Sequence, residues 1–172
     1  ETREAQQAQQ KRRQKKIDDM LDKFTKRMKK QVERQQKSLE EIDKQGVSGR
    51  ERSEIEQNRK ELSKLGKMLD QKDVKGALDA ARESLDKLRT MRFNLNLSQR
   101  HARKGSEQAR KADRALEEAK EMIPRGKRIE RELEDLMRRA NQQLNRPNGS
   151  KLQKLAEQQK KIGEQAEQLN KK

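Results

Sequence analysis

The stretch that decides the fold runs from residue 74 to residue 123 and reads VKGALDAARESLDKLRTMRFNLNLSQRHARKGSEQARKADRALEEAKEMI. Every seventh residue from Val74 is apolar, a series that continues through Ala81, Leu88, Leu95, Ala102, Ala109, Leu116 and Ile123. Because seven residues make almost two helical turns, these side chains line one side of a helix, a line we call a seam. An unbroken helix here is about 75 Å long and needs partners along its length.

The scarcity of apolar residues narrows the class of fold. Leu, Ile, Val and Phe number 28 of 172 residues, while 44% of the residues are charged and the formal net charge is +16. Such a composition is typical of disordered basic chains. The few apolar residues nevertheless recur at helical spacing, which predicts helices that bury narrow stripes. We expect an all-α, elongated helical bundle or coiled coil of about five helices.

The N-terminal part, residues 1–95, is predicted to be a bundle of three helices over about 5–45, 50–70 and 74–95. The first helix has apolar residues at spacings of 4, 3 and 4, namely Ile17, Leu21, Phe24 and Met28. The glycines of 46–49 predict a turn after it. Asn58 takes a seam position of the second helix, where a polar residue often sets register or partner number. Asp73 is the predicted N-cap of the third helix.

The C-terminal part, residues 96–172, is predicted to be a second three-helix bundle that shares the long helix. That helix continues to residue 123, and Pro124 ends or kinks it. Two further helices follow over 127–146 and 150–172, and the turn signal of residues 146–150 makes them an antiparallel hairpin. Residues 93–97 also alternate as a strand would, but an isolated strand has no sheet to join, so we predict helix. Small seam residues after it, such as Gly105, permit close helix approach or mark a weak, exposed stretch.

Side-chain patterns that carry catalysis are nearly absent. The only histidine, His101, has no second His or Cys near it in sequence, and the chain has no cysteine. Paired carboxylates such as Asp18 and Asp19 stand beside Lys and Arg, as solvated ion pairs do. Neither a phosphate-binding glycine loop nor a metal-ligand spacing is found. We predict that the protein is not an enzyme, with no catalytic, cofactor-binding or metal-binding residues and no cofactor.

Runs of Lys and Arg in the sequence say more about function than these catalytic patterns do. Residues 11–37 hold twelve Lys or Arg against four acids, a net charge of +8, and residues 100–114 hold six against two, a net charge of +4. Such surfaces attract nucleic acid phosphates, acidic proteins or anionic lipid headgroups, and they also serve merely as solvated helix faces. The candidate anion-binding face consists of Lys11, Arg12, Arg13, Lys15, Lys16, Lys26, Arg27, Lys29, Lys30, Arg100, Arg103 and Lys104.

Two observations limit what such a face does. The chain has no Trp or Tyr to stack on bases, and both phenylalanines are expected to pack in the protein, so base sequence is not read by stacking. Residues 11–32 also have the pattern of a membrane-surface helix. Because the same apolar seam continues to Ile42 and recurs in four other segments, packing against partner helices is the favoured interpretation.

The chain has no apolar run of about 18 residues, so no transmembrane segment is predicted. It begins with Glu1 rather than Met and ends in Lys171 and Lys172 without a helix stop signal. We therefore expect a soluble segment cut from a longer protein, or a processed mature chain, whose targeting information lies elsewhere.

Parts of residues 62–88, LSKLGKML and KGALDAARESLDKL, together with the closing phrase LAEQQKK at residues 155–161, resemble repeats in the Gln-rich helical C-terminal regions of large bacterial membrane proteins of unknown function. The resemblance covers about a third of the chain. It implies a scaffold tethered to a bacterial envelope through parts not present in this chain, and it implies no known activity.

The pattern as a whole favours a non-enzymatic helical scaffold or protein-interaction segment. Its expected partners are other helical proteins or copies of itself, joined through coiled-coil seams. The alternative is a basic protein associated with nucleic acid or ribonucleoprotein that binds phosphates without sequence specificity. Steep loss of binding with salt distinguishes this alternative.

Overall fold

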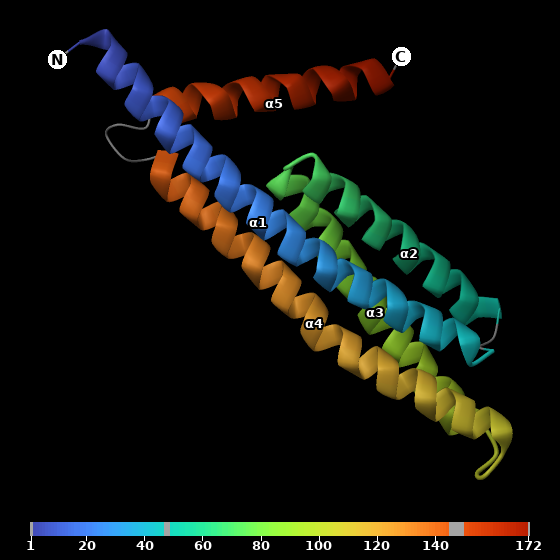
Figure 1. The fold of residues 1–172 in the computed structure, drawn as a ribbon. Coiled ribbons are helices and arrows are strands. Elements are labelled where there is room, and N and C mark those ends of the chain that lie inside the picture. Colours follow the sequence, from blue (N-terminus) through green and yellow to red (C-terminus); the bar gives the residue numbers. More distant parts are fainter. Residues whose placement is uncertain (1, 47–48, 145–149, 172) are drawn as a thin grey trace. The chain divides into compact units, whose positions relative to one another are not determined.

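The computed structural model describes residues 2–46, 49–144 and 150–171, with side chains described for all of these except 143, 144 and 150–157. The described chain forms five helices: α1 (Arg3–Lys44), α2 (Gly49–Asp70), α3 (Val74–His101), α4 (Glu107–Leu144) and α5 (Ser150–Asn170) (Figure 1). These residues contain no strand, and residues 93–97 are helical. The predicted all-α bundle of about five helices is confirmed.

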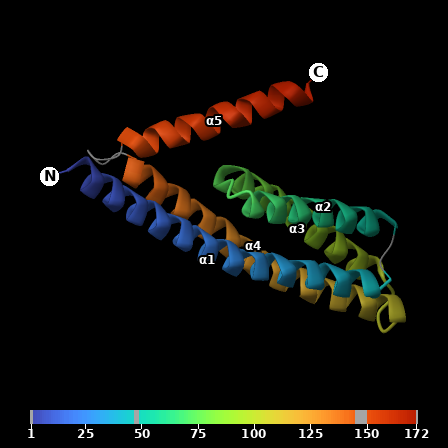
Figure 2. The ribbon, with the colours of Figure 1, turned by 45° about the horizontal axis from the view of Figure 1, so that its top comes forward.

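The chain divides into two compact units, Glu1–Leu133 and Glu134–Lys172. Neighbouring helices of the first unit run in opposite directions from α1 to α4 (Figures 1 and 2). The end of α1 therefore lies beside the start of α4, where the Cβ position of Gly46 is 4.0 Å from Lys111 Nζ. The expected boundary between two bundles, at residues 95 and 96, falls inside α3.

The core of the first unit is built from four narrow apolar stripes, one from each helix. They consist of Met28, Val32, Leu39 and Ile42 of α1; Ile55, Leu62, Leu65 and Leu69 of α2; Leu78, Leu85, Leu88, Met91 and Leu95 of α3; and Leu116, Met122, Ile123, Ile129 and Leu133 of α4. Spacings of three and four residues place each stripe on one side of its helix. The helices thus bury a continuous core although the composition is poor in apolar residues.

The fourth helix approaches the others most closely at Gly126, which is buried. A Cβ atom on Gly126 would lie 3.2 Å from Leu85 Cδ1 of α3 and 3.5 Å from Gln35 Nε2 of α1. Beside this contact, Gln35 Nε2 donates a hydrogen bond of 2.9 Å to the backbone carbonyl of Met122. The absence of a side chain at residue 126 lets the α4 backbone come within reach of this amide.

The predicted unbroken helix over residues 74–123 is wrong. α3 ends at His101, and Gly105 has a left-handed backbone with φ +74°. Ser106 Oγ then accepts a hydrogen bond of 3.2 Å from the backbone N–H of Ala109, which caps the start of α4. The helix shared by the two predicted bundles is therefore interrupted by a turn. Gly105 belongs to this turn and not to a seam.

The predicted end of a helix at Pro124, with a new helix starting at 127, is also wrong. α4 continues through Pro124. The ring is on the exposed side of the helix, whereas Ile123 and Ile129 are buried. Proline inside a helix costs about 3 kcal/mol, and burial of two large aliphatic side chains, at about 1.5–3 kcal/mol each, offsets that cost.

The last helix lacks the packing that the sequence predicts. Every described side chain of α5, from residue 158 onward, is exposed, so these residues do not show the packing expected in the predicted hairpin of helices 127–146 and 150–172. The hairpin itself stays a prediction. The helix itself begins at Ser150 as predicted. Residues 47–48 and 145–149, on which the two predicted turns largely fall, lie outside the described residues.

The start of α3 is confirmed. The Asp73 carboxylate accepts a hydrogen bond of 2.9 Å from the backbone N–H of Gly76, as an N-cap does. Before it, Lys72 has φ +56° and its Nζ lies 3.0 Å from Asp22 Oδ1 of α1. Hydrogen bonding to Asp22 raises the pKa of Lys72. This contact fixes where the α2–α3 turn meets α1.

We expect Gly105→Ala and Gly66→Ala to change stability in opposite directions. Alanine at residue 105 must adopt a left-handed backbone, which costs about 1–2 kcal/mol. Gly66 lies inside α2, and a Cβ atom there meets nothing within 4 Å, so alanine should stabilise the protein by about 0.5–1 kcal/mol. Urea unfolding followed by circular dichroism measures both. An unbroken helix over 74–123 would instead make both substitutions stabilising.

Candidate functional site

The twelve residues of the predicted anion-binding face lie in two separate groups. Nine are on α1 between Lys11 and Lys30, and Arg100, Arg103 and Lys104 are at the turn between α3 and α4. This turn lies near the end of α1 (Figure 2), and Lys30 is fourteen residues, or about 21 Å of helix, before that end. The structure thus does not bring the twelve into one face. Whether either group binds an anion stays a prediction.

The nine cations on α1 differ in their surroundings. Arg27 Nε lies 3.8 Å from Glu132 Oε2, and its guanidinium lies 5.5 Å from the centre of the Phe24 ring. Lys29 Nζ lies 2.7 Å from Asp70 Oδ1. These two side chains connect α1 to α4 and α2. By contrast, the five cations of residues 11–16 are exposed and form no ion pair within the described part of the chain.

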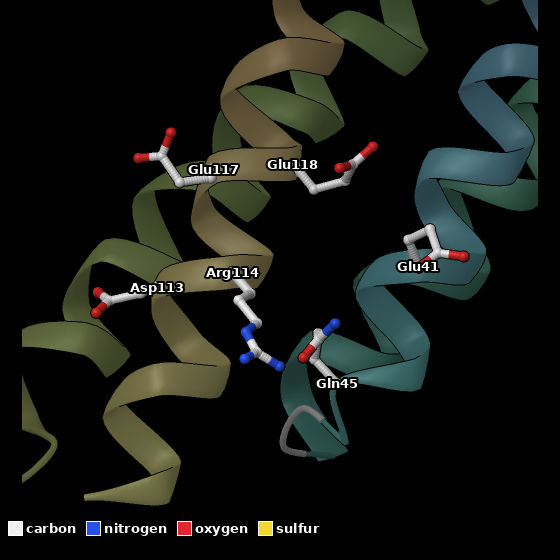
Figure 3. A pocket seen from close by; sticks show the side chains of 6 residues that line it. All are labelled: Glu41, Gln45, Asp113, Arg114, Glu117 and Glu118. Atoms are coloured by element: carbon white, nitrogen blue, oxygen red, sulfur yellow. The ribbon is translucent and has the colours of Figure 1, made fainter. Parts of the chain in front are cut away.

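A hollow of about 360 Å³ lies between the end of α1 and the start of α4. It is lined by Glu41, Gln45, Asp113, Arg114, Glu117 and Glu118. Figure 3 shows Arg114 and Gln45 extending toward each other across it. Of the carboxylates, Glu41 pairs with Lys44 at 3.2 Å, Glu117 pairs with Lys120 at 3.6 Å, and Asp113 accepts a hydrogen bond from Gln99. These charges are satisfied at the surface, and the hollow offers no paired acid and base.

A second hollow, between α2 and α3, contains a carboxyl group with an altered acidity. Its lining includes Glu54, whose Oε1 accepts a hydrogen bond from Asn94 of α3. Burial raises the pKa of Glu54 above its ordinary value of 4.5, and the Glu51 carboxylate adds to the rise, while the Asn94 hydrogen bond and the Arg50 charge act in the opposite direction. Its acidity follows from helix packing and gives no evidence of a catalytic role.

Polar side chains also make contacts between helices inside the core and at its edge. Ser84 Oγ donates to Asn58 Oδ1 at 3.1 Å, which joins α3 to α2. Arg125 Nη1 donates to Ser38 Oγ at 2.8 Å, close to the Gln35 bond described above. Asn58 is fully buried on the seam, as predicted. Its effect on register or partner number stays a prediction.

The residues that sequence reasoning examined for chemistry lie apart from one another. His101 is exposed at the end of α3. Across the residues that the structure describes, no group of three or more His, Cys, Asp or Glu is arranged to hold a metal ion. None of the helices in the described ranges is both long enough and apolar enough to cross a membrane.

Sequence reasoning missed the polar contacts of α1 with α4 and one exposed aromatic side chain. Gln35 and Ser38 interrupt the apolar spacing of α1, which was the available signal, but their partners are 87 residues away. Phe93 is 62% exposed, so the expectation that both phenylalanines pack inside the protein is wrong for this residue.

Comparisons with models of protein families, with curated proteins and with solved structures found no match to this chain. The resemblance to the Gln-rich regions of bacterial membrane proteins therefore stays a prediction.

We expect Ser84→Ala to destabilise the protein by about 1–3 kcal/mol, because it leaves the buried Asn58 carbonyl oxygen without its donor. In an Asn58→Leu background the same change should cost almost nothing, since no buried acceptor remains. A double-mutant cycle by urea unfolding measures the coupling between the two residues. Equal costs in both backgrounds would mean that this hydrogen bond contributes nothing to stability.

We expect Glu54→Gln to raise the melting temperature at pH 7. The raised pKa means that the native state binds the Glu54 proton more tightly than the unfolded state, so this carboxyl lowers stability as pH rises through the native pKa. Glutamine keeps an oxygen that can accept from Asn94 without the charge. The gain in melting temperature from Glu54→Gln should disappear below pH 4.5, the ordinary pKa of this carboxyl group, because there the carboxyl is protonated in both the native and the unfolded state.

Melting curves of the two proteins from pH 3 to pH 7 test this expectation. Glu83→Gln, at an exposed position of α3, is the matched control and should show no such pH-dependent advantage. A difference between Glu54→Gln and the original protein that stays constant over the whole range would contradict the prediction.

Proposed function

We propose that the chain is a non-enzymatic helical scaffold that associates with a second copy of itself through α5. The observation that carries this proposal is the exposed seam of α5, where Ile162 is 64% exposed and Leu169 is 76% exposed. Large aliphatic side chains at helical spacing on a charged, Gln-rich helix are typical of a coiled-coil contact face. The exposure of both large apolar side chains described on this face favours a partner helix.

The order of residues along the α5 seam favours a copy of the same helix as the partner. The seam continues from Leu152 and Leu155 in the sequence through Gln159, Ile162, Ala166 and Leu169. An antiparallel pair centred between residues 160 and 161 matches 152 with 169, 155 with 166, and 159 with 162. Each large residue at 155 then faces a small one at 166. Such a pair is two-fold symmetric, as contacts between identical chains usually are.

The residues that flank the middle of this seam are uncharged, whereas Lys151 and Lys172 flank its two ends and would face each other between two antiparallel copies. Gln158 and Gln165 lie on one side, and Gly163 and Asn170 lie on the other. In coiled coils these flanking positions set partner choice, and like charges there oppose pairing. The lysines at 160 and 161 fall on the outer face. Neutral and small flanks in the middle of the seam permit close approach of identical helices, and the lysines at its ends oppose it.

The contact is short, so we expect a weak dimer. Burial of Ile162 and Leu169 from both copies gains about 1.5–3 kcal/mol for each side chain, and the loss of translational and rotational freedom opposes this gain. The dimer should therefore dissociate on dilution.

Light scattering over a range of concentrations tests the proposal. The mass should rise from 20.3 kDa toward twice that value as concentration increases. Ile162→Asp should hold it at 20.3 kDa at all concentrations, because the pair would bury a charge. Gln168→Asp, which adds the same charge on the outer face of α5, is the matched control and should dimerise as before. A monomer throughout, or an oligomer that Ile162→Asp leaves intact, would overturn the proposal.

A further inference from the structure

The first part of α1 carries a cluster of five cations that no other part of the described chain neutralises. The cluster consists of Lys11, Arg12, Arg13, Lys15 and Lys16. All five are exposed, and none has an ion-pair partner among the described residues. Ion pairs do form further along the same helix, at Arg27 and Lys29. Other exposed cations, such as Lys64 and Lys67, also lack an ion-pair partner within the described ranges, so the cluster is set apart by its density of charge, with five cations and no acid in six residues.

This cluster lies before the first half-buried residues of α1, which are Ile17, Asp18 and Leu21. The α2–α3 turn meets α1 at the ion pair of Lys72 with Asp22. The nineteen residues from Arg3 to Leu21 lie before that contact, which is about 28 Å of helix (Figure 2). Every residue from 2 to 16 is exposed. A stretch of helix whose side chains are exposed can enter a groove, whereas a helix packed on a bundle surface presents one face only.

The arrangement is unfavourable for the isolated helix. Lys11 and Lys15 are four residues apart, as are Arg12 and Lys16, so like charges are stacked one turn apart. The six residues of the cluster contain no acid that could offset this repulsion. The nearest acids, Asp18 and Asp19, follow the cluster, and Asp18 accepts a hydrogen bond of 3.2 Å from Gln14. A bound polyanion would remove these repulsions.

The angular spread of the cations identifies the kind of polyanion. At about 100° per residue, Lys11 and Lys15 lie on one flank of the helix, Arg13 and Lys16 lie about 150° around on the other, and Arg12 lies between the two flanks. The major groove of B-form DNA is about 12 Å wide, admits an α-helix, and has a row of phosphates along each wall. A helix in this groove needs cations on both flanks, which is the arrangement that the cluster has.

Other anionic surfaces fit less well. A membrane presents a flat layer of headgroups, which cannot meet both flanks at once, and residues 3–16 have no large apolar side chain to insert. Single-stranded nucleic acid is held by aromatic stacking, and the phenylalanine nearest to the cluster, Phe24, is half-buried. The nearby glutamines at 7, 10 and 14 are uncharged and able to donate hydrogen bonds to phosphates.

We propose that residues 3–16 of α1 bind the major groove of double-stranded DNA, with Lys11 and Lys15 on the phosphates of one wall and Arg13 and Lys16 on those of the other. The contacts are mainly to phosphates, so binding depends little on base sequence. This inference does not depend on the pairing of α5.

Fluorescence anisotropy with a labelled 20-base-pair duplex of mixed sequence tests the proposal. Four phosphate contacts predict that affinity falls about 150-fold between 50 mM and 200 mM salt. Changing all five cations to Gln should abolish this binding. The control changes five other exposed cations to Gln, namely Arg52, Lys60, Lys64, Lys67 and Lys75, and lowers the net charge equally. It should keep most of the affinity, and circular dichroism confirms that both variants are helical.

Several outcomes would overturn the proposal. Failure of the original protein to bind the duplex at 50 mM salt would do so. Equal losses of affinity in both variants would also do so, because net charge would then be the cause. Equal or tighter binding to the labelled single strand would exclude groove binding. Equal or tighter binding to vesicles of phosphatidylserine and phosphatidylcholine would assign the cluster to a membrane surface.

Discussion

The close approach of α4 to α1 and α3 at Gly126 is the contact on which the first unit depends. Each of its helices has only a narrow apolar stripe, and a stripe is buried only when other stripes face it from several sides. α4 supplies the last of these stripes, with Met122, Ile123 and Ile129 on either side of the glycine. A side chain at residue 126 would meet Leu85 at 3.2 Å. The leucine methyl group would have to shift by a few tenths of an ångström to admit a Cβ atom, so the missing side chain lets the four stripes meet without this adjustment.

Polar contacts at the same place make this arrangement specific. An amide such as Gln35 costs free energy when it is buried without a partner. Its bond to the Met122 carbonyl removes part of that cost, and it forms only when α4 has its observed position and register. The Arg125 bond to Ser38 lies one turn along α1 and restricts the same two helices. Apolar stripes that slide past one another by a turn lose little burial, so these polar groups select one register.

Helix positions could be predicted from spacing, because a stripe repeats at three and four residues in the sequence itself. The bounds of α1, α2 and α5 and the Asp73 cap are local features of this kind. The break at Gly105 was missed because Ala102 and Ala109 on either side are compatible with both a seam and an exposed surface. At Pro124 the error was the opposite one, because the sequence predicted a helix end where α4 continues. Burial of Ile123 and Ile129 outweighs the cost of a proline inside the helix.

The contacts of the candidate sites were less predictable, because they join residues that are far apart in the sequence. A cluster of cations can be seen in the sequence, but the unpaired state of Arg12 and the pairing of Lys29 with Asp70 depend on which helices lie near. The bond of Gln35 to Met122 joins residues 87 positions apart, and no local pattern specifies such a pair. The exposed seam of α5 is similar, because its spacing predicts a partner helix without saying whether the same chain supplies it.

The least stabilised parts of the described chain are the parts that carry features suited to a ligand. Helix formation in water gains little without tertiary packing, and both residues 3–16 of α1 and the described side chains of α5 are exposed. Stacked like charges weaken the first segment, and Gly163 inside α5 costs about 1 kcal/mol relative to alanine. A partner that neutralises the cations or covers the seam would remove these costs in the bound state only. The proposed partners would therefore stabilise these two segments as helices when they bind.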